Sequence, residues 1–352
     1  MSETLKIDMP YLTEFLIGLL NTPSPTGYTE AALAYTEKAL ADLLPEAPRT
    51  ATRKGALAVT WPGAAADQPR ALTAHVDTLG AMVKEVKHNG RLKLTKIGGF
   101  SWHTVEGEGL TVLAASGGRV RGTLLPVKAS SHIHGGELDK LERTDENLEV
   151  RLDARVSMAD DVQALGLGVG DFVAFDPRVE VGEAGFIRSR HLDDKACVAI
   201  MLAAVKAVLE AGRQPAQRTT LHISNYEEVG HGGAAGFPAD LAELLTLDMA
   251  AVGEGQNSDE FSADICVKDS GGPYHLEMRR KLVSIAEAAG VPYRLDIYPF
   301  YASDGEALWR AGGDVRVGLV GPGVDASHSY ERTHADSLEN TARLVAEYVV
   351  RA

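Results

Sequence analysis

The sequence contains few cysteines: Cys197 and Cys266 are the two among 352 residues. Two cysteines are too few for a disulfide framework or for a zinc site built from four thiolates. A metal ion bound by this chain would therefore be held mainly by histidine and carboxylate side chains.

Positive charge is also in deficit. Thirty-five Lys and Arg residues face 49 Asp and Glu residues, which gives a formal net charge of -14. Such a surplus repels the phosphates of nucleic acids and anionic lipid head groups. We therefore expect neither a nucleic acid nor a membrane as a partner.

Long apolar runs are missing as well. None reaches the roughly 20 residues of a membrane-spanning helix, and the run from Ala196 to Val205 stops at Lys206. No basic stretch precedes the first apolar run, Tyr11 to Leu20, and Glu14 interrupts it, so no secretory signal peptide is indicated. The content of 45% hydrophobic and 24% charged residues is typical of a folded globular chain. We expect a cytoplasmic protein.

Helices and strands alternate in the N-terminal region. Apolar residues recur at helical spacing from Tyr11 to Leu20 and from Glu30 to Leu44, with a break at Thr22 to Gly27. Ala56 to Trp61 and Arg70 to His75 read as strands, the second almost wholly apolar, as in a buried strand. This places His75 at the carboxyl end of a strand, where open α/β sheets carry their sites.

The pattern changes between about Leu79 and Gly182. Short apolar-polar alternations, such as Arg91 to Ile97 and Leu110 to Ala114, are separated by glycine-containing turns. This predicts a small all-β domain that contains one helical stretch, Met158 to Leu165. After His191 the alternation of helices and strands returns.

The later segments complete an α/β pattern. We predict a helix at Ala196–Ala211, a strand at Thr219–Ser224, a helix at Gly272–Ala289 and a terminal helix at Ser337–Val350. The expected fold class is α/β, a mixed β-sheet flanked by helices, with a small all-β domain inserted. We place the parent domain at residues 1–80 and 182–352 and the insertion at residues 81–181.

The first segment that could carry chemistry is AHVDTLG, Ala74 to Gly80. Alternation along a strand puts His75 and Asp77 on the same face. A metal-binding histidine usually needs a carboxylate or carbonyl to fix its tautomer, and Asp77 is placed to supply one. A core histidine beside an aspartate in a turn is the alternative interpretation.

The second segment is HLDDKA, His191 to Ala196, with two adjacent carboxylates at the start of an apolar helix. Helix capping explains one of Asp193 and Asp194 well and two of them poorly. Because a carboxylate has two oxygens and can bridge two divalent ions, this pair contains a candidate shared ligand.

The third segment is NYEEVGHGGA, Asn225 to Ala234, directly after a predicted strand. Adjacent glutamates, Glu227 and Glu228, ahead of a glycine-rich turn have no obvious packing purpose, although a solvated loop is the alternative. In metal-assisted hydrolysis one carboxylate can hold the ion while its neighbour takes a proton from water.

Weaker candidates complete the set. Asp248 ends the apolar run Leu244 to Leu247, and Asp304 lies in the turn-like sequence YASDG. His328 and His334 both precede the terminal helix.

Taken in chain order, these segments resemble the tetrahedral aminopeptidases, the glutamyl or deblocking aminopeptidase family of dinuclear zinc metallopeptidases. The family pattern runs AHxDE(I/L)G, LDDR or LDNR, EEVG with a following Gly-Ala, an Asp after a buried strand, and HS before a Leu-Glu-Asn helix. Here it reads AHVDTLG, HLDDKA, YEEVGHGGA, LLTLD, and SHSYE followed by SLENTARL. The insertion is similar too, at Gly122 to His132 and Leu167 to Asp171, so the resemblance covers nearly the whole chain.

The resemblance implies a role for each part. Residues 1–80 and 182–352 would form a zinc-exopeptidase-like catalytic domain, and residues 81–181 a β-barrel-like oligomerisation domain. Two divalent ions would be held by five side chains: His75 and Asp248 on the first, Glu228 and His328 on the second, and Asp193 on both. Glu227 would be the general base, and Asp77 would orient His75.

His334 is the alternative to His328 as the last ligand. Placing His328 on the family's HS brings Glu331 close to its expected offset, whereas His334 would break the His-Ser pair. We favour His328.

Three departures from the family pattern lie beside the expected site. Thr78 replaces an acidic residue, Lys195 replaces an arginine, and Ala196-Cys197 stands where a glycine is common. None removes a ligand. They indicate a divergent branch, and the form HVDTLGAMV is similar to relatives that accompany the biosynthesis of an acetylated dipeptide osmoprotectant.

The resemblance implies an aminopeptidase that removes N-terminal residues from short peptides with two metal ions, zinc, cobalt or manganese being compatible with such donors. A metal-dependent amidase or deacylase acting on a small N-acyl, peptide-like metabolite is the alternative. A non-catalytic assembly protein is a third class, although all five ligands and the base are present. The family's assemblies imply a homo-oligomer in which dimers build a dodecamer.

Overall fold

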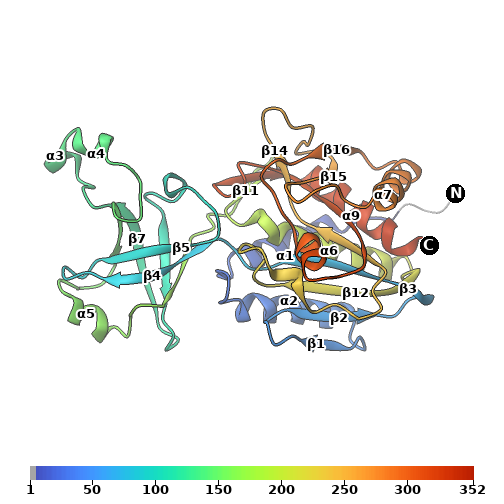
Figure 1. Cartoon of the computed structure of the whole chain (residues 1–352), viewed down its shortest axis with the longest axis horizontal. Coiled ribbons are helices and arrows are strands. Elements are labelled where there is room, and N and C mark those ends of the chain that lie inside the picture. Colours follow the sequence, from blue (N-terminus) through green and yellow to red (C-terminus); the bar gives the residue numbers. More distant parts are fainter. Residues whose placement is uncertain (1–4) are drawn as a thin grey trace. The chain divides into compact units, whose positions relative to one another are not determined.

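The computed structural model describes residues 5–352 and divides into two compact units. The larger unit contains the chain up to Asp77 together with Arg178–Ala352, and the smaller unit is Thr78–Pro177 (Figure 1). The larger unit combines a mixed sheet with helices and the smaller one is all β except for short helices. The expected fold class is confirmed.

The larger unit contains helices from both ends of the chain. They are α1 (Met9–Leu20), α2 (Glu30–Leu43), α6 (Leu192–Glu210), α7 (Leu276–Ala289), α8 (Asp304–Arg310), α9 (Ala335–Val350) and the 3-10 turn η2 (Gly232–Ala234). Its strands are β1 (Arg49–Ala51), β2 (Leu57–Trp61), β3 (Ala65–His75), β10 (Glu180–Val181), β11 (Phe186–Ser189), β12 (Gln217–Ser224), β13 (Glu243–Leu247), β14 (Ala250–Val252), β15 (Ala263–Lys268), β16 (Tyr293–Ile297), β17 (Arg316–Asp325) and β18 (Glu331–His334).

The sheet of this unit has 12 strands, with the order β1-β2-β12-β3-β13-β17-β18-β11-β10 along its main path. Its centre is parallel: β3 pairs with β12 and with β13, and β13 pairs with β17. In this register Leu72 of β3 lies opposite Leu221 and Leu245. Because these four strands run the same way, their carboxyl ends lie at one edge of the sheet.

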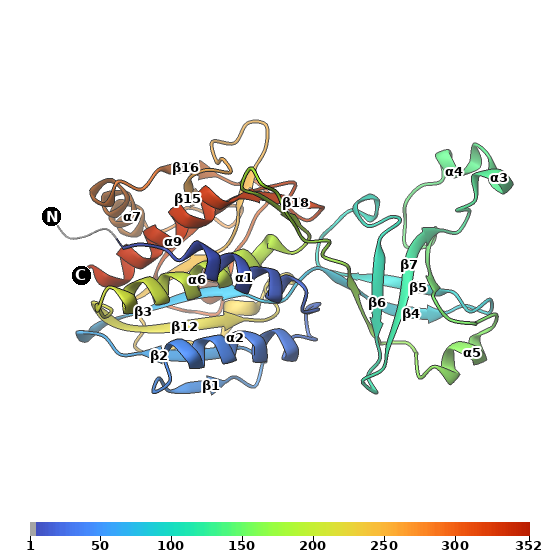
Figure 2. The same cartoon turned by 180° about the vertical axis from the view of Figure 1, so that it is seen from behind.

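Alternating side chains of the central strands are buried on the two faces of the sheet. On β3, Leu72 joins the larger apolar cluster with α1, α2, α6, α7 and α9, whereas Ala71 joins a second cluster with α8. On β13, Leu245 joins the larger cluster and Leu244 joins the second one. Figure 2 shows α1, α6 and α9 next to one another across the sheet. The near-continuous apolar strands thus follow from burial on both faces.

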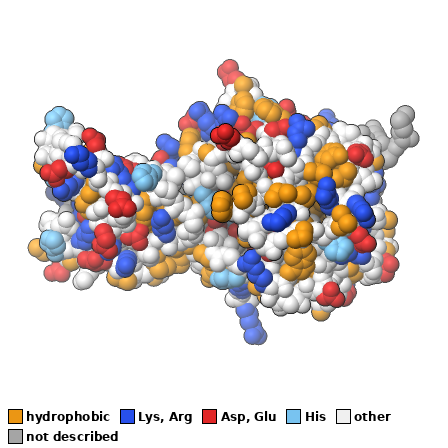
Figure 3. All heavy atoms as spheres, turned by 45° about the horizontal axis from the view of Figure 1, so that its top comes forward, with side chains coloured by type: hydrophobic (Ala, Val, Ile, Leu, Met, Phe, Trp, Pro, Cys, Tyr) orange, Lys and Arg blue, Asp and Glu red, His pale blue; other side chains and the backbone are white. Residues whose placement is uncertain are grey.

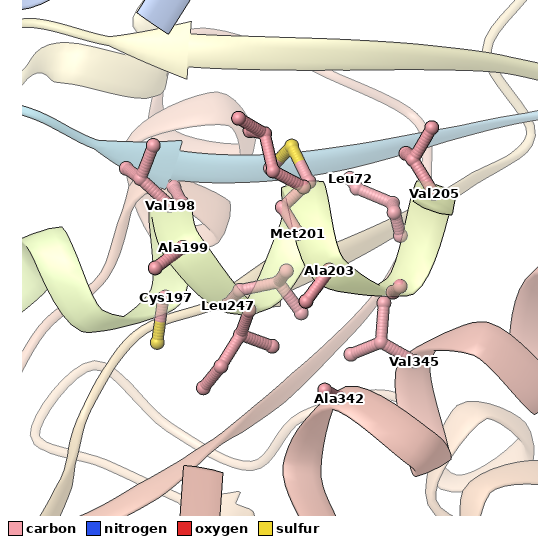
Figure 4. Packing of buried hydrophobic residues seen from close by; sticks show 14 of the residues in the cluster. Leu72, Cys197, Val198, Ala199, Met201, Ala203, Val205, Leu247, Ala342 and Val345 are labelled. Atoms are coloured by element: carbon pink, nitrogen blue, oxygen red, sulfur yellow. The ribbon is translucent and has the colours of Figure 1, made fainter. Parts of the chain in front are cut away.

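Helix α6 is the centre of the larger cluster. Every residue from Ala196 to Val205 is buried, as expected for a helix that is apolar all round. Figure 4 shows its side chains packed among Leu72 and Leu247 of the sheet and Ala342 and Val345 of α9. At its start, Asp193 and Asp194 have non-helical backbone angles, so the regular helix begins after the two carboxylates.

The smaller unit is a closed barrel with the strand order β4-β5-β8-β7-β6-β9. Its elements are β4 (Gly80–Val86), β5 (Leu92–Ile97), η1 (Trp102–Thr104), β6 (Gly109–Leu113), β7 (Arg119–Pro126), α3 (Ser131–His134), α4 (Glu137–Lys140), β8 (Leu148–Leu152), α5 (Ala159–Ala164) and β9 (Phe172–Phe175). A separate apolar cluster that includes Leu92, Leu110 and Val150 fills it. The helical stretch predicted at Met158–Leu165 corresponds to α5, whereas α3 and α4 were not predicted.

One predicted helix begins too early. The expectation was Gly272–Ala289, but α7 begins at Leu276. Gly272 has φ of 140° and Pro273 pairs through an isolated bridge with Lys268, so this segment continues the sheet region before the helix starts. No helix among residues 5–352 is long and apolar enough to cross a membrane.

Acidic and basic side chains are interspersed on the surface. Figure 3 shows Asp and Glu next to Lys and Arg over most of the face in view. On this face, the acidic surplus of the sequence is therefore spread out and does not form one large patch.

His222 makes the stability of the fold depend on pH. It lies on β12, is fully buried, pairs with the Thr73 hydroxyl at 2.9 Å and packs against the Phe237 ring. Burial, with a smaller effect of Lys54, lowers its pKa to about 4. The unfolded chain, with a histidine pKa near 6.5, therefore binds this proton more readily.

Stability should consequently fall as the pH drops from about 6.5 towards about 4. Between pH 7 and pH 4.5 we expect the wild type to lose about 2 kcal/mol more unfolding free energy than His222→Gln, which cannot titrate there. Urea unfolding at the two pH values measures this difference. Equal losses in both proteins would contradict the assignment of a neutral, buried His222.

Candidate metal centre and active site

The candidate site lies where neighbouring strands end. β3 ends at His75, Glu227 and Glu228 follow β12, Asp248 follows β13, and His328 follows β17. The carboxyl ends of parallel strands meet at one edge of the sheet, which brings these residues together although up to 253 positions separate them (75 to 328). Asp193, at the start of α6, joins them.

His75 is held in one tautomer. Its Nδ1 lies 2.9 Å from the backbone oxygen of Asp77. A carbonyl oxygen only accepts, so Nδ1 carries a hydrogen, and in the neutral ring Nε2 is the nitrogen with the lone pair. Within the described residues Nε2 has no hydrogen-bond partner, although it is buried. The ring is thus oriented for a ligand at Nε2, and the partner that orients it is the carbonyl of Asp77, with the Asp77 carboxylate 3.5 Å away.

Asp193 lies between the two histidines. Its Oδ1 is 3.3 Å from Nε2 of His75, and its Oδ2 is 3.3 Å from Nε2 of His328. Glu228 approaches the same nitrogen of His328 at 3.6 Å, and Glu227 approaches Nε2 of His75 at 3.6 Å. One carboxylate therefore faces both halves of the site with a different oxygen.

Three overlapping groups of side chains place ligand atoms within 4.8 Å of one another. They are His75 with Glu227 and Asp248, Asp193 with Glu228 and His328, and Asp193 with Asp194 and Asp248. These groups contain all five predicted ligands and the predicted base. They add Asp194, which the sequence analysis left aside as a ligand.

The carboxylates of the site are crowded and poorly hydrated. Burial, reinforced by neighbouring carboxylates, raises the pKa of Glu227, Glu228 and Asp248 well above the usual range. Burial would do the same to Asp193, but His328 and His75 outweigh it and lower the pKa of Asp193. The same ion pairing, with Asp77, raises the pKa of His75 against the effect of burial. Crowding and burial thus disfavour the ionised carboxylates, and a bound cation would stabilise them.

Asp77 supports the glutamates as well as His75. Its carboxylate accepts from the backbone amides of Glu227 at 3.2 Å and Glu228 at 3.3 Å. The Thr26 hydroxyl donates to the same carboxylate at 2.7 Å. Thr26 lies in a segment that the sequence analysis treated as a helix break, and no sequence signal distinguishes it from the other residues of that break.

Glu331 holds the backbone of Asp193 and His328, in the half of the site that contains His328. Its Oε1 accepts from the backbone amide of His328 at 3.0 Å, and its Oε2 accepts from that of Asp193 at 3.1 Å. Burial and the Asp193 charge raise its pKa to about 8. The sequence analysis used Glu331 only to align the last histidine. A glutamate three residues after a candidate ligand was the available signal for this contact.

His334 has other partners. Its Nε2 lies 2.8 Å from the backbone oxygen of Ala184, and its Nδ1 accepts from the amide of Asp336 at 3.0 Å at the start of α9. It belongs to none of the three ligand groups found among residues 5–352. Of the two histidines, His328 is the one that the structure brings to the site.

Two further contacts surround the site. Lys195, fully buried, donates to the backbone oxygens of Leu19 at 3.0 Å and Thr22 at 2.7 Å, which joins the start of α6 to the end of α1. The Tyr301 hydroxyl donates to the backbone oxygen of Met249 at 2.8 Å, next to Asp248. Neither contact could be derived from spacing along the chain.

Comparison with known proteins identifies the family of this chain. The sequence matches the family model described as M42 glutamyl aminopeptidase over residues 55–344. The Bacillus subtilis protein named "Putative aminopeptidase YhfE" is 48% identical over 336 residues, which cover 96% of each chain. The class is therefore that of the peptidases. The chain belongs to the M42 aminopeptidase family, which confirms the resemblance drawn from the motifs.

Solved structures share the fold over the whole chain. The TET aminopeptidase from the marine sediment archaeon Thaumarchaeota archaeon SCGC AB-539-E09 superposes with a TM-score of 0.86 at 17% identity, covering 97% of this chain and 96% of that one. The TET1 peptidase of Pyrococcus horikoshii superposes with a TM-score of 0.82 at 19% identity, covering 97% and 100%. At these identities the likeness establishes the fold.

Proposed function

We propose that this aminopeptidase uses two divalent metal ions and a glutamate base to remove N-terminal residues from short peptides. The observation that carries the proposal is the position of Asp193, whose two oxygens face His75 and His328 at 3.3 Å each. The family membership supports peptides as substrates. None of the comparisons reported above favours the alternative, an amidase that acts on an N-acyl metabolite.

The donor set fits such ions. Nε2 of His75 is buried without a hydrogen-bond partner in the described chain, and the carboxylates of Asp193 and Glu227 lie 3.3 and 3.6 Å from it. His75 and Asp248 would hold one ion, Glu228 and His328 the other, and Asp193 both. Imidazole and carboxylate donors suit zinc, cobalt and manganese. Bound ions of this kind supply Lewis acidity, which acidifies a water molecule and polarises the peptide carbonyl.

Glu227 would then act as the base. Its carboxylate lies in the same ligand group as His75 and Asp248, and Asp77 holds its backbone amide. Burial raises the pKa of Glu227, which makes its carboxylate a stronger proton acceptor. In the reaction Glu227 would accept a proton from the attacking water and deliver it to the departing amine.

Glu227→Gln should separate proton transfer from metal binding. The amide keeps the size of the side chain but cannot accept the proton, so we expect kcat to fall by about a thousandfold. The bound metal, measured by elemental analysis, should remain at the wild-type level. The readout is hydrolysis of a panel of aminoacyl-p-nitroanilides.

Two controls make this result specific. Glu183→Gln, at an exposed position, should leave turnover unchanged. Wild-type enzyme treated with EDTA should lose activity and regain it with Zn²⁺ or Co²⁺. Wild-type turnover in Glu227→Gln would exclude Glu227 as the base.

We further propose that the chain forms a homo-oligomer through the barrel unit, with dimers that build a dodecamer, and that it acts in the cytoplasm. The Pyrococcus horikoshii structure is described as assembling into a tetrahedron or a large octahedral shell. In the barrel unit the apolar side chains of Ile133, Val169 and Met158 are 77%, 72% and 50% exposed. Contact surfaces typically contain contiguous exposed apolar side chains, and these three residues are our candidates for such a surface.

Light scattering after gel filtration tests the assembly. We expect a mass that is a large multiple of the 37.5 kDa chain. Replacing Ile133 and Val169 together with Ser should lower this mass while the far-UV circular dichroism stays unchanged. A wild-type protein that runs as a monomer at micromolar concentration would contradict the proposal.

A further inference from the structure

The turn that carries Glu227 and Glu228 has little regular structure of its own. It follows β12, and its first residue, Tyr226, has φ of 74°. Two backbone hydrogen bonds close it, from Gly230 to Glu227 at 2.6 Å and from His231 to Tyr226 at 3.1 Å. Gly230 and His231 are exposed. The position of the turn therefore depends on side chains that reach it from elsewhere in the chain.

Asp304 holds the end of this turn. Its Oδ1 accepts from the backbone amide of Gly233 at 2.5 Å, and the residue is buried at the start of α8. The approach is so close that a Cβ atom on Gly233 would lie 2.3 Å from the backbone oxygen of Asp304. Asp77 likewise accepts from the amides of the two glutamates. The carboxylates of Asp304 and Asp77 therefore both fix the turn through its N–H groups.

Lys54 contacts the same turn through its carbonyl groups. It comes from the connection between β1 and β2, and β2 is the neighbour of β12 in the sheet. Its Nζ donates to the backbone oxygens of His231 and, at 3.2 Å, Gly232. The ammonium group also lies 5.9 Å from the centre of the Tyr226 ring, on which the His231 ring stacks.

The charge of Lys54 suits this place. Partial burial lowers its pKa, and the nearby Asp304 and Asp77 carboxylates oppose that change by favouring the ammonium form. A charged donor on carbonyl oxygens makes stronger hydrogen bonds than a neutral one. In a region with this many carboxylates, Lys54 also offsets negative charge beside the turn.

We propose that Lys54 is a positioning residue, which fixes the turn bearing Glu227 and Glu228 by holding the carbonyl groups of His231 and Gly232. The inference deepens the proposed function, since it takes Glu227 as the base. Lys54 would not contact substrate. Its loss should therefore affect the chemical step more than substrate binding.

Kinetics of three variants test this role. In Lys54→Met the stem remains but the donors are lost, and we expect kcat to fall by roughly 10- to 100-fold with KM within about twofold of wild type. Lys54→Arg can still donate to both carbonyls and should recover most of kcat. The control is Lys38→Met, because Lys38 is 79% exposed and forms its ion pair with Asp42, one helical turn away. This variant should match wild type.

Hydrogen exchange supplies a readout that does not need activity. In Lys54→Met the amides of Gly230 and His231, which close the turn, should exchange faster, while peptides from β13 and the melting temperature stay as in wild type. Unchanged kcat, unchanged exchange in the turn, or a loss that spreads to the whole protein would each overturn the proposal. If the wild type itself proved inactive on peptides, the proposed function would fail, and exchange would still decide the role of Lys54.

Discussion

Buried negative charge is the constraint around which this protein is built. The edge of the central strands gathers eight buried or nearly buried carboxyl groups: Asp77, Asp193, Asp194, Glu227, Glu228, Asp248, Asp304 and Glu331. An unpaired carboxylate inside a protein costs several kcal/mol, and each neighbour of like charge adds to that cost. The pKa values of Asp194, Glu227, Glu228 and Asp248 are raised for the same reasons, burial and neighbouring carboxylates.

Such a cluster persists because the surrounding chain holds it rigidly. Parallel pairing of β12, β3, β13 and β17 brings the strand ends together, and the fully apolar part of α6 packs against them. Hydrogen bonds then hold the backbone of the site. The Asp77 carboxylate accepts from the amides of Glu227 and Glu228, and the Glu331 carboxylate accepts from those of Asp193 and His328. We interpret these contacts as preparation for divalent cations, which would neutralise the charge that the fold concentrates.

The sequence was sufficient for the class of fold, and it singled out most of the side chains that the structure brings together at the strand ends. Strand and helix periodicities alternate clearly on both sides of the β insertion, so the parent fold could be predicted. Most candidate ligands could be found because they end or follow an apolar run or begin an apolar helix, as His75 and Asp193 do, whereas His328 was noted ahead of the terminal helix. Their mutual geometry follows from the parallel order of the strands, which the sequence pattern alone does not specify.

Other features could not be predicted from local patterns. Lys54 reaches His231 across 177 positions, and Thr26 reaches Asp77 across 51. Such contacts depend on the order of the strands in the sheet, because that order decides which loops lie next to one another. The start of α7 was predicted too early for a similar reason. A proline such as Pro273 is compatible with the first turn of a helix, but its bridge to Lys268 keeps this segment extended.

The central claim is that the carboxylate cluster holds two ions with Asp193 between them. Anomalous diffraction at the zinc edge, from crystals of the protein loaded with Zn²⁺, tests it directly. We predict two peaks in each chain, one beside His75 and Asp248 and the other beside Glu228 and His328, with Asp193 in contact with both. A single peak, or peaks away from these side chains, would contradict the account.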